Sequence, residues 1–287
     1  MIPRLNSLHA YPLHDALHTA GTAPMRSGPP AQWLTQSQAQ SPASLLAFDS
    51  STEQLAIAVS GPAGDVSFQG PGGALASATL LPQIHAMCQR AGLALTALDA
   101  IAFGRGPGAF TGLRTSCAVA QGLALGLGCP VLPIDSLLIV AEDARAQAAV
   151  SSDAVFDVGV AMDARMGEVY AARWRWRHSR WQVVDSALLC TPELLVAAWA
   201  AQPPGWLAGS AWSALGSRLE MPAGPQHLMQ TPQRAAALLR LAVMAHVEGP
   251  GLDAALALPL YLRDKVALTT LERDAVRAAA AAVGAMT

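Results

Sequence analysis

Charged and aromatic residues are scarce in this sequence. Of its 287 residues, 13% are charged and 5% are aromatic, and the formal net charge is −2. A protein that binds nucleic acid by itself usually carries an excess of basic residues, because neutralising the phosphates supplies most of its affinity. The composition therefore argues against a chain that holds RNA alone. If RNA is involved, we expect a partner to hold it.

Cysteine is also scarce, and no two cysteines form a C-x-x-C pair. We expect the four thiols to be ordinary buried groups in a reducing compartment. The longest apolar stretch, residues 117–134, is interrupted by Gln121, several glycines and Pro130. A membrane helix needs about 20 continuous apolar residues. We therefore expect no membrane insertion.

The two ends of the chain differ from its middle. Residues 1–43 are rich in Pro, Ser, Gln, Ala and Gly and show no sustained period. Such a segment buries too little apolar surface to offset the entropy of ordering it, so we predict a disordered N-terminal extension. It lacks a basic start followed by an apolar run, and so does not resemble a secretory signal. The Ala-rich residues 267–287 are predicted to be a weakly anchored tail.

Between these ends, strand and helix patterns alternate. Apolar runs bounded by turn residues predict a meander of three strands, and helical spacing marks the segments between the later strands. The predicted strands are 45–48, 55–59, 65–68, 100–103 and 130–134, and the predicted helices are 77–91, 111–127 and 136–148, the last capped by Ser136.

The opening pattern then returns. Residues 158–162 form an apolar run that ends in Asp163, as residues 45–48 end in Asp49, and a second strand follows each polar turn. A repeated unit is a clue to the fold. We predict an α/β fold with mixed sheets, the duplicated two-lobed architecture of the actin, sugar-kinase and Hsp70 class. The predicted lobes are residues 44–148 and 149–266, with a final helix over 232–246 that completes the second lobe.

The Gly-rich segment after Phe103 is the strongest local feature. Its glycines allow a sharp turn and a close approach by a phosphate or by another chain segment. One interpretation is a dinucleotide site, with Asp135 as the ribose-binding acid. The other is a tight turn that brings a helix onto the sheet. The glycines concerned are Gly104, Gly106, Gly108 and Gly112.

Four motifs, in order, resemble those of the TsaB (YeaZ) family of bacterial tRNA-modification proteins. The segment 104–114 resembles the family signature, which usually has Ser where this chain has Ala109. The other three motifs are residues 46–52, 163–170 and 259–263. Residues 121–124 also match the run that follows the family signature. The resemblance spans residues 45–266.

The resemblance implies a non-catalytic subunit that works in the cytoplasm. It implies pairing with a catalytic paralogue, TsaD, and with an ATPase, TsaE, and a homodimer in the absence of the partner. Together these proteins transfer a threonylcarbamoyl group from its adenylate to the adenosine beside the tRNA anticodon. Contact with tRNA would then be indirect, through the complex.

The residues that could carry chemistry are few. The first turn, with Asp49, Ser51 and Thr52, is small and polar enough to hold a phosphate, whereas the second turn after Asp163 is bulky. We interpret these four residues as remnants of nucleotide loops. His85 stands alone on its helix, and one imidazole without a carboxylate does not make a transition-metal site. We therefore predict no catalytic residue, no cofactor and no metal, and Asp49 and Asp163 are the acids to test.

Two apolar helices are candidates for the partner interface. The first carries two apolar stripes, more than one sheet contact requires, and the second is rich in small residues. The predicted interface residues are Leu80, Leu81, Ile84, Met87, Thr111, Arg114, Ala118 and Gln121. Arginines alternate with tryptophans over residues 173–177, which predicts a strand with one solvated face and leaves RNA contact open.

Two other functions are alternatives. A small-molecule kinase or ATPase of the same fold would need a glycine-rich second phosphate turn, and residues 208–211 are the nearest match. A Rossmann-type dehydrogenase would bind NAD. Neither alternative accounts for the ordered set of motifs.

Overall fold

The computed structural model describes residues 43–221 and 224–263. All of these residues belong to one compact unit. The predicted extension over residues 1–43, apart from Ala43, and the predicted tail over residues 267–287 lie outside the described residues.

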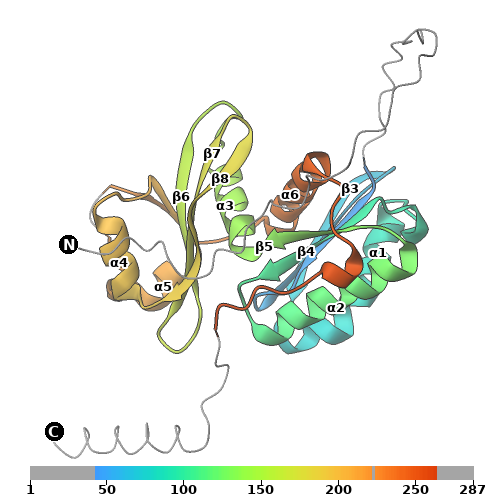
Figure 1. The fold of residues 1–287 in the computed structure, drawn as a ribbon, viewed down its shortest axis with the longest axis horizontal. Coiled ribbons are helices and arrows are strands. Elements are labelled where there is room, and N and C mark those ends of the chain that lie inside the picture. The colour runs from blue at the N-terminus through green and yellow to red at the C-terminus, as the bar shows by residue number, and fades with distance from the viewer. Residues whose placement is uncertain (1–42, 222–223, 264–287) are drawn as a thin grey trace, which may run out of the picture. The chain divides into compact units, whose positions relative to one another are not determined.

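The first sheet has five strands in the order β3-β2-β1-β4-β5 (Figure 1). Its first three strands form an antiparallel meander, and β4 and β5 join parallel to β1. The strands are β1 (Leu45–Asp49), β2 (Gln54–Gly61), β3 (Gly64–Pro71), β4 (Ala100–Gly106) and β5 (Val131–Asp135), and the helices are α1 (Ala76–Arg90), α2 (Phe110–Leu127) and α3 (Ser136–Gln147).

The second sheet repeats this topology. Read from its other edge, its order is β8-β7-β6-β9-β10, with the same pattern of antiparallel and parallel pairs. The strands are β6 (Phe156–Asp163), β7 (Val169–Arg177), β8 (Arg180–Cys190), β9 (Trp206–Ala208) and β10 (Gln226–Leu228), and the helices are α4 (Pro192–Ala200), α5 (Ala211–Leu215) and α6 (Arg234–Glu248). The predicted duplicated α/β fold of the actin-like class is confirmed.

Short 3₁₀ helices complete the described elements. They are η1 (Gly73–Leu75), η2 (Leu95–Ala97), η3 (Gly216–Leu219) and η4 (Ala254–Leu256). The last of them packs against α2. It leads into residues 257–263, which run along the first half of the molecule, where the N–H of Leu260 donates to the carbonyl of Arg105.

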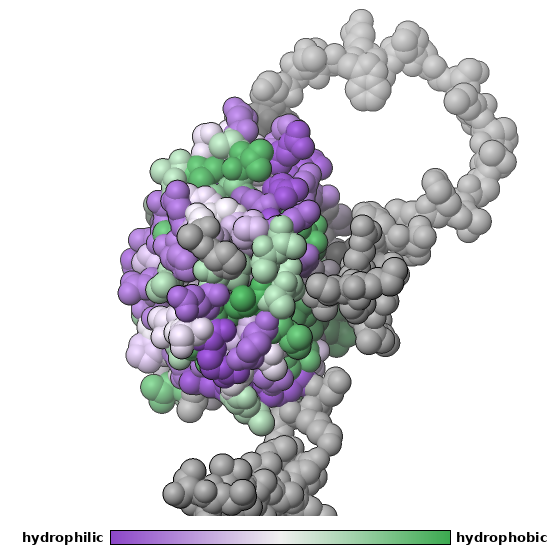
Figure 2. Space-filling view, turned by 90° about the vertical axis from the view of Figure 1, so that its left-hand side faces the viewer, coloured by the Kyte–Doolittle hydropathy of each residue, from purple (hydrophilic) through white to green (hydrophobic). Residues whose placement is uncertain are grey.

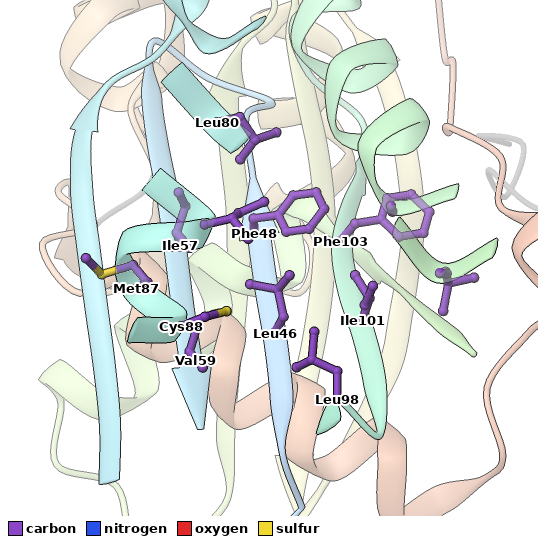
Figure 3. Close-up of a cluster of buried hydrophobic side chains, with 14 of the residues drawn as sticks. Leu46, Phe48, Ile57, Val59, Leu80, Met87, Cys88, Leu98, Ile101 and Phe103 are labelled. Atoms are coloured by element: carbon purple, nitrogen blue, oxygen red, sulfur yellow. The ribbon is translucent and has the colours of Figure 1, made fainter. Parts of the chain in front are cut away.

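Helices cover both faces of the first sheet. On one face, α1 and α2 pack over a cluster of large apolar side chains that includes Phe48, Ile57 and Phe103 (Figure 3). On the other face lies α6, whose Leu238 and Leu241 pack against alanines of the strands. The prediction that the final helix completes the second lobe is therefore wrong. It belongs to the second half in sequence but buries its apolar face on the first sheet.

The second sheet is covered in the same way. Helix α3 packs on one face, with Leu137 and Val140 against the aromatic side chains Phe156 and Trp174, and α4 and α5 pack on the other. Because α3 and α6 also pack against each other, the two halves are interlocked through their last helices.

The surface on the side of the second sheet mixes hydrophilic and hydrophobic residues (Figure 2). Within residues 43–221 and 224–263, no helix has both the length and the apolar character needed to cross a membrane.

Candidate functional site

A cleft of about 500 Å³ opens between the hairpin turns of the two sheets. Its walls include the turn after β1, the loop before α2, the turn between β6 and β7, and residues 260–263. The starts of α3 and α6 and residues around α5 complete the lining. The predicted nucleotide-loop remnants Ser51, Thr52 and Asp163 line this cleft, whereas Asp49 does not.

Asp49 is fully buried and paired with a buried arginine. Nε and Nη2 of Arg234 both donate to its Oδ2, at 2.9 and 2.5 Å. The hydroxyls of Ser51 and Ser136 donate to the same carboxylate, at 2.9 and 3.1 Å. A carboxylate with these partners has no oxygen left for a substrate or a metal. The geometry therefore favours the structural role for Asp49.

The turn after β1 is also closed by α2. The backbone N–H of Ser50 donates to Ser116 Oγ at 3.1 Å, and the Ser50 hydroxyl donates to the carbonyl of Gly112 at 2.8 Å. The N–H of Ser51 turns inward to Asp49 Oδ1 at 3.3 Å. A phosphate-binding turn needs such N–H groups to converge on the anion. Here they are already used within the chain.

The glycines of the segment before α2 permit this close packing. A Cβ on Gly104 would lie 1.9 Å from Asp49 Oδ1, and one on Gly112 would lie 1.8 Å from the carbonyl oxygen of Ser50. A Cβ on Gly108 would lie 2.4 Å from the carbonyl oxygen of Ser51. Gly106 has a φ of +111°. The four predicted glycines thus make room for protein atoms, which supports the tight-turn interpretation over a dinucleotide site.

The turn between β6 and β7 folds around its own polar groups. Asp163 accepts the N–H of Arg165 at 2.8 Å, and Arg165 and Met166 both have positive φ. Arg263 donates to the carbonyl of Ala164 at 3.0 Å and pairs with Glu168 at 2.7 Å. This is the arrangement of a structural hairpin, with bulky side chains where a phosphate turn has small ones.

The structure corrects part of the predicted interface. Leu80, Ile84 and Met87 lie in the core between α1 and the sheet, with at most 3% of their surface exposed. Leu81, on the other stripe of the helix, is 49% exposed. The buried three are therefore not available to a partner in this conformation, because they pack against the first sheet.

The predicted residues on α2 lie mainly on its outer face. Thr111, Arg114 and Ala118 are exposed, and Gln121 is half-buried with its amide donating to the carbonyl of Ala257 at 2.9 Å. Leu125 is 80% exposed and continues this face, although it was not among the predicted residues. The spacing 111, 114, 118 and 125 follows one side of a helix.

Several expectations on single residues can also be compared with the structure. Ser136 does not cap α3 with its side chain, because its hydroxyl is used by Asp49 and by the N–H of Gly106. Trp174 and Trp176 are buried, which leaves no surface on which a base could stack. Arg173 pairs with Asp157 at 2.7 Å.

Among the described residues, the cysteines and histidines show no arrangement for chemistry. Within the described residues all four cysteines are free, and burial raises the pKa of each thiol, that of Cys190 to about 11. The ring of His85 is exposed and contacts Gln89. The part of the chain that the structure describes holds no group of three His, Cys, Asp or Glu residues suited to a metal ion.

Sequence reasoning missed Arg234, the central cation of this site. It lies 185 residues from Asp49 along the chain. Its one signal is a charged residue at the start of a helix whose following residues are mostly apolar. That signal is weak, because one charged residue beside an apolar run does not show whether its side chain is buried or exposed.

Comparisons with known proteins point to the formation of threonylcarbamoyladenosine on tRNA. The family model described as "TsaD: tRNA N6-adenosine threonylcarbamoyltransferase" matches residues 75–203. The "tRNA threonylcarbamoyladenosine biosynthesis protein TsaB" of Haemophilus influenzae is 32% identical over 77% of this chain and 94% of its own length. The protein of the same name from Escherichia coli is 33% identical over 66% of this chain and 80% of its own length.

A solved structure points the same way. A Pseudomonas aeruginosa protein, described as uncharacterized with similarity to the peptidase YeaZ, is 38% identical and superposes with a TM-score of 0.68 over 77% of this chain and all of its own length. YeaZ from the same organism gives 35% identity and a TM-score of 0.66. On the identity and coverage of these relatives, the chain belongs to the TsaB family.

Proposed function

We propose that this chain is a non-catalytic subunit in the formation of threonylcarbamoyladenosine on tRNA, which binds and supports a TsaD-type catalytic protein. Relatives that match most of the chain carry the name of that biosynthesis. The observation that supports an accessory role is the buried Asp49–Arg234 pair. It occupies the acid at the end of β1, the position from which a working member of the fold would act on a nucleotide or its metal.

The partner surface in this proposal is the exposed face that α1 and α2 share. The two helices contact each other on one side of the first sheet (Figure 1). Leu81 on α1 and Leu125 on α2 present exposed apolar side chains. The outer face of α2 also carries the small residues Ala118 and Gly122. Small residues let a second helix approach closely, so helices of the partner could pack here.

The remaining partners follow from the same proposal. A TsaE-type ATPase joins the complex, tRNA is contacted indirectly, and a homodimer forms through the same face when the catalytic partner is absent. We propose the cytoplasm as the location, where the tRNA substrate is made. Arg114 and Thr111 lie at the end of this face nearest the cleft, so a partner bound there would also border the cleft.

The test is reconstitution of tRNA modification from TsaD, TsaE and threonylcarbamoyl-adenylate, with and without this chain. We expect modification only with the chain present, and no turnover by the chain alone. Leu81→Arg should abolish binding to TsaD, because it places a charge in the apolar contact. Val247→Arg is the matched control, since Val247 is 80% exposed on α6, outside the proposed face.

The outcomes separate the proposal from its alternatives. Equal modification without the chain would contradict a supporting role, and transfer by the chain alone would contradict its non-catalytic status. ATP-dependent phosphorylation of a small molecule by the chain would favour the kinase alternative. Ile84→Arg is unsuitable as an interface test, because Ile84 is 1% exposed and its substitution would disrupt the core.

A further inference from the structure

Helix α3 is attached to both halves of the molecule. It begins at Ser136, directly after β5 of the first sheet. The Ser136 hydroxyl donates to Asp49 at 3.1 Å and accepts from the N–H of Gly106 at 3.0 Å, and both of these residues belong to strands of the first sheet. Further along the helix, Leu137 and Val140 pack against the second sheet. The start of α3 is therefore anchored to the first sheet, while its apolar face covers the second.

Glu142 gives the two halves a second point of attachment. It lies about two helical turns beyond Ser136 on α3, and it is fully buried. Its carboxylate accepts from Nε of Arg240 at 2.6 Å. Arg240 belongs to α6, which packs on the first sheet. One anchor alone would act as a pivot, whereas two anchors at different points along a helix fix its orientation.

The second half holds this carboxylate in place. Nε and Nη2 of Arg145 donate to its two oxygens, each at 2.9 Å, and Nε1 of Trp181 donates to Oε2 at 3.1 Å. Trp181 lies on β8 and packs edge-on against Trp176 of the neighbouring strand. Because charge-assisted hydrogen bonds depend on geometry, a carboxylate with these donors has a fixed orientation relative to the second sheet.

The remaining contact in this region is apolar. Leu138, Trp181 and Met244 each pack against the buried cluster beneath α6 and against the buried cluster of the second sheet. Apolar contacts are not directional, so two packed helices can slide or rotate by a small amount without losing them. Among the described residues, Glu142 is the one acceptor that the Arg240 guanidinium binds, and Arg240 Nη2 is buried there without a partner. The directional part of the contact therefore depends on Glu142.

We propose that Glu142, through Arg240, holds the two halves of the molecule in one fixed arrangement. The starts of α3 and α6 and the hairpin turns of both sheets line the cleft of about 500 Å³, so the same contact sets the width of that cleft. This device lies in the α3–α6 contact, apart from the exposed α1–α2 face. It does not depend on the proposed partner role, and its failure would leave that role unchanged.

The experiment measures the distance between the two halves in single molecules of the full chain. Fluorescent donor and acceptor groups are placed at Ser67 on β3 and at Ala197 on α4, which are exposed and belong to different halves. A ketone-bearing amino acid at each position carries the label, so the native cysteines stay unchanged. We expect the otherwise unsubstituted chain to give one narrow distribution of energy transfer, because a single arrangement is populated.

Arg240→Ala tests the proposal with little risk to the fold, since the Arg240 side chain is 38% exposed. It should raise the population of other arrangements, relative to the first, at least about tenfold, because a charge-assisted hydrogen bond is lost. Glu142→Gln keeps the shape of the side chain without its charge, and should act in the same direction. Arg175→Ala is the matched control. Arg175 is 42% exposed and pairs with Asp157, but both residues lie in the second sheet.

Three results would overturn the proposal. One is a broad or divided distribution in the unsubstituted chain, which would mean that the halves move despite Glu142. Another is a distribution that stays single and narrow in Arg240→Ala, which would mean that the apolar contact and the hairpin turns suffice. The third is an equal broadening in Arg175→Ala, which would mean that any lost ion pair loosens the chain. If Glu142→Gln does not fold, Arg240→Ala and its control decide the outcome alone.

Discussion

At the scale of single residues, the Asp49–Arg234 pair is the feature on which the site depends. Both side chains are almost completely buried, at 0% and 3% exposed. A buried ion pair gives little net stability when compared with apolar residues, but removal of one partner leaves an unpaired charge in the interior. The pair therefore makes the first half sensitive to changes at either position.

We predict that Arg234→Met lowers the free energy of unfolding by about 3–5 kcal/mol, because Asp49 loses its counter-ion. Adding Asp49→Asn should recover part of that loss, since the remaining amide carries no charge. Urea denaturation of the two single variants and the double variant measures this. Strictly additive losses would show that the two side chains do not act as a pair.

Two glycines of α2 give opposite predictions for the same substitution. A Cβ on Gly112 would clash with the Ser50 carbonyl, whereas one on Gly122 would meet nothing within 4 Å. Gly112→Ala should therefore cost about 1–3 kcal/mol through overpacking. Gly122→Ala should gain about 0.5–1 kcal/mol, because alanine loses less backbone entropy in a helix. Urea denaturation of both variants checks the signs, and equal signs would contradict the assignment of Gly112 to close packing.

How far the sequence predicts the site differs between its parts. It places Asp49 and Asp163 at the ends of corresponding strands, because an apolar run that ends in a polar turn is a local signal. It cannot supply Arg234, because nothing in a local pattern connects residues 185 positions apart. It also cannot decide which of two apolar stripes on α1 faces the sheet, so three buried residues were assigned to a surface.

At the scale of elements, the contact between α3 and α6 is the feature least predictable from sequence. The strands and helices from β1 to β6, and α6, are predicted to within a few residues, because each has its own periodicity, whereas α4, α5, β9 and β10 were given no prediction. The exchange of α3 and α6 between the two sheets depends on tertiary packing that periodicity does not encode. A helix with apolar residues on one face shows that it must pack, but the pattern does not say on which sheet.

A buried acid in this contact predicts a dependence of stability on pH. Burial raises the pKa of Asp143 above its ordinary value of 3.8, although Gln147 donates to Oδ2 at 3.0 Å. At pH values between the ordinary pKa of 3.8 and the raised pKa in the folded protein, the folded state binds more protons than the unfolded state. The free energy of unfolding contributed by Asp143 therefore falls as pH rises through this window.

Asp143→Asn should remove this contribution. Compared with the wild type, the variant should gain stability as the pH rises from acidic to neutral, because the wild type alone must bury a charge. Urea denaturation across that range gives the difference between the two curves. Asp157→Asn is a suitable comparison, since Asp157 forms ion pairs with two arginines. Parallel curves for Asp143→Asn and the wild type would contradict the prediction.

At the scale of the whole molecule, residues 259–263 connect the two halves (red in Figure 1). The N–H of Leu260 donates to the carbonyl of Arg105 at 2.7 Å, beside the first sheet. Arg263 reaches the turn of the second sheet, where it pairs with Glu168 and binds the carbonyl of Ala164. The contact between Arg165 and Glu53 also joins the halves, but both side chains are more than 70% exposed, so it contributes little.

Arg263 should therefore be the side chain that ties residues 259–263 to the second half. We predict that Arg263→Ala lowers the free energy of unfolding by about 1–3 kcal/mol, since it removes charge-assisted hydrogen bonds from a mostly buried group. Amide exchange should quicken at Ala164 and Glu168, whose N–H groups form the hydrogen bonds of that turn.

Arg177→Ala is the control for this prediction, because Arg177 is exposed and forms no ion pair within the described residues. Its stability should stay within about 0.5 kcal/mol of the wild type. If Arg263→Ala also leaves the free energy of unfolding unchanged, and amide exchange in the turn is unchanged, residues 259–263 do not stabilise the β6–β7 hairpin. The cleft would then owe its shape to the interlocked helices α3 and α6 alone.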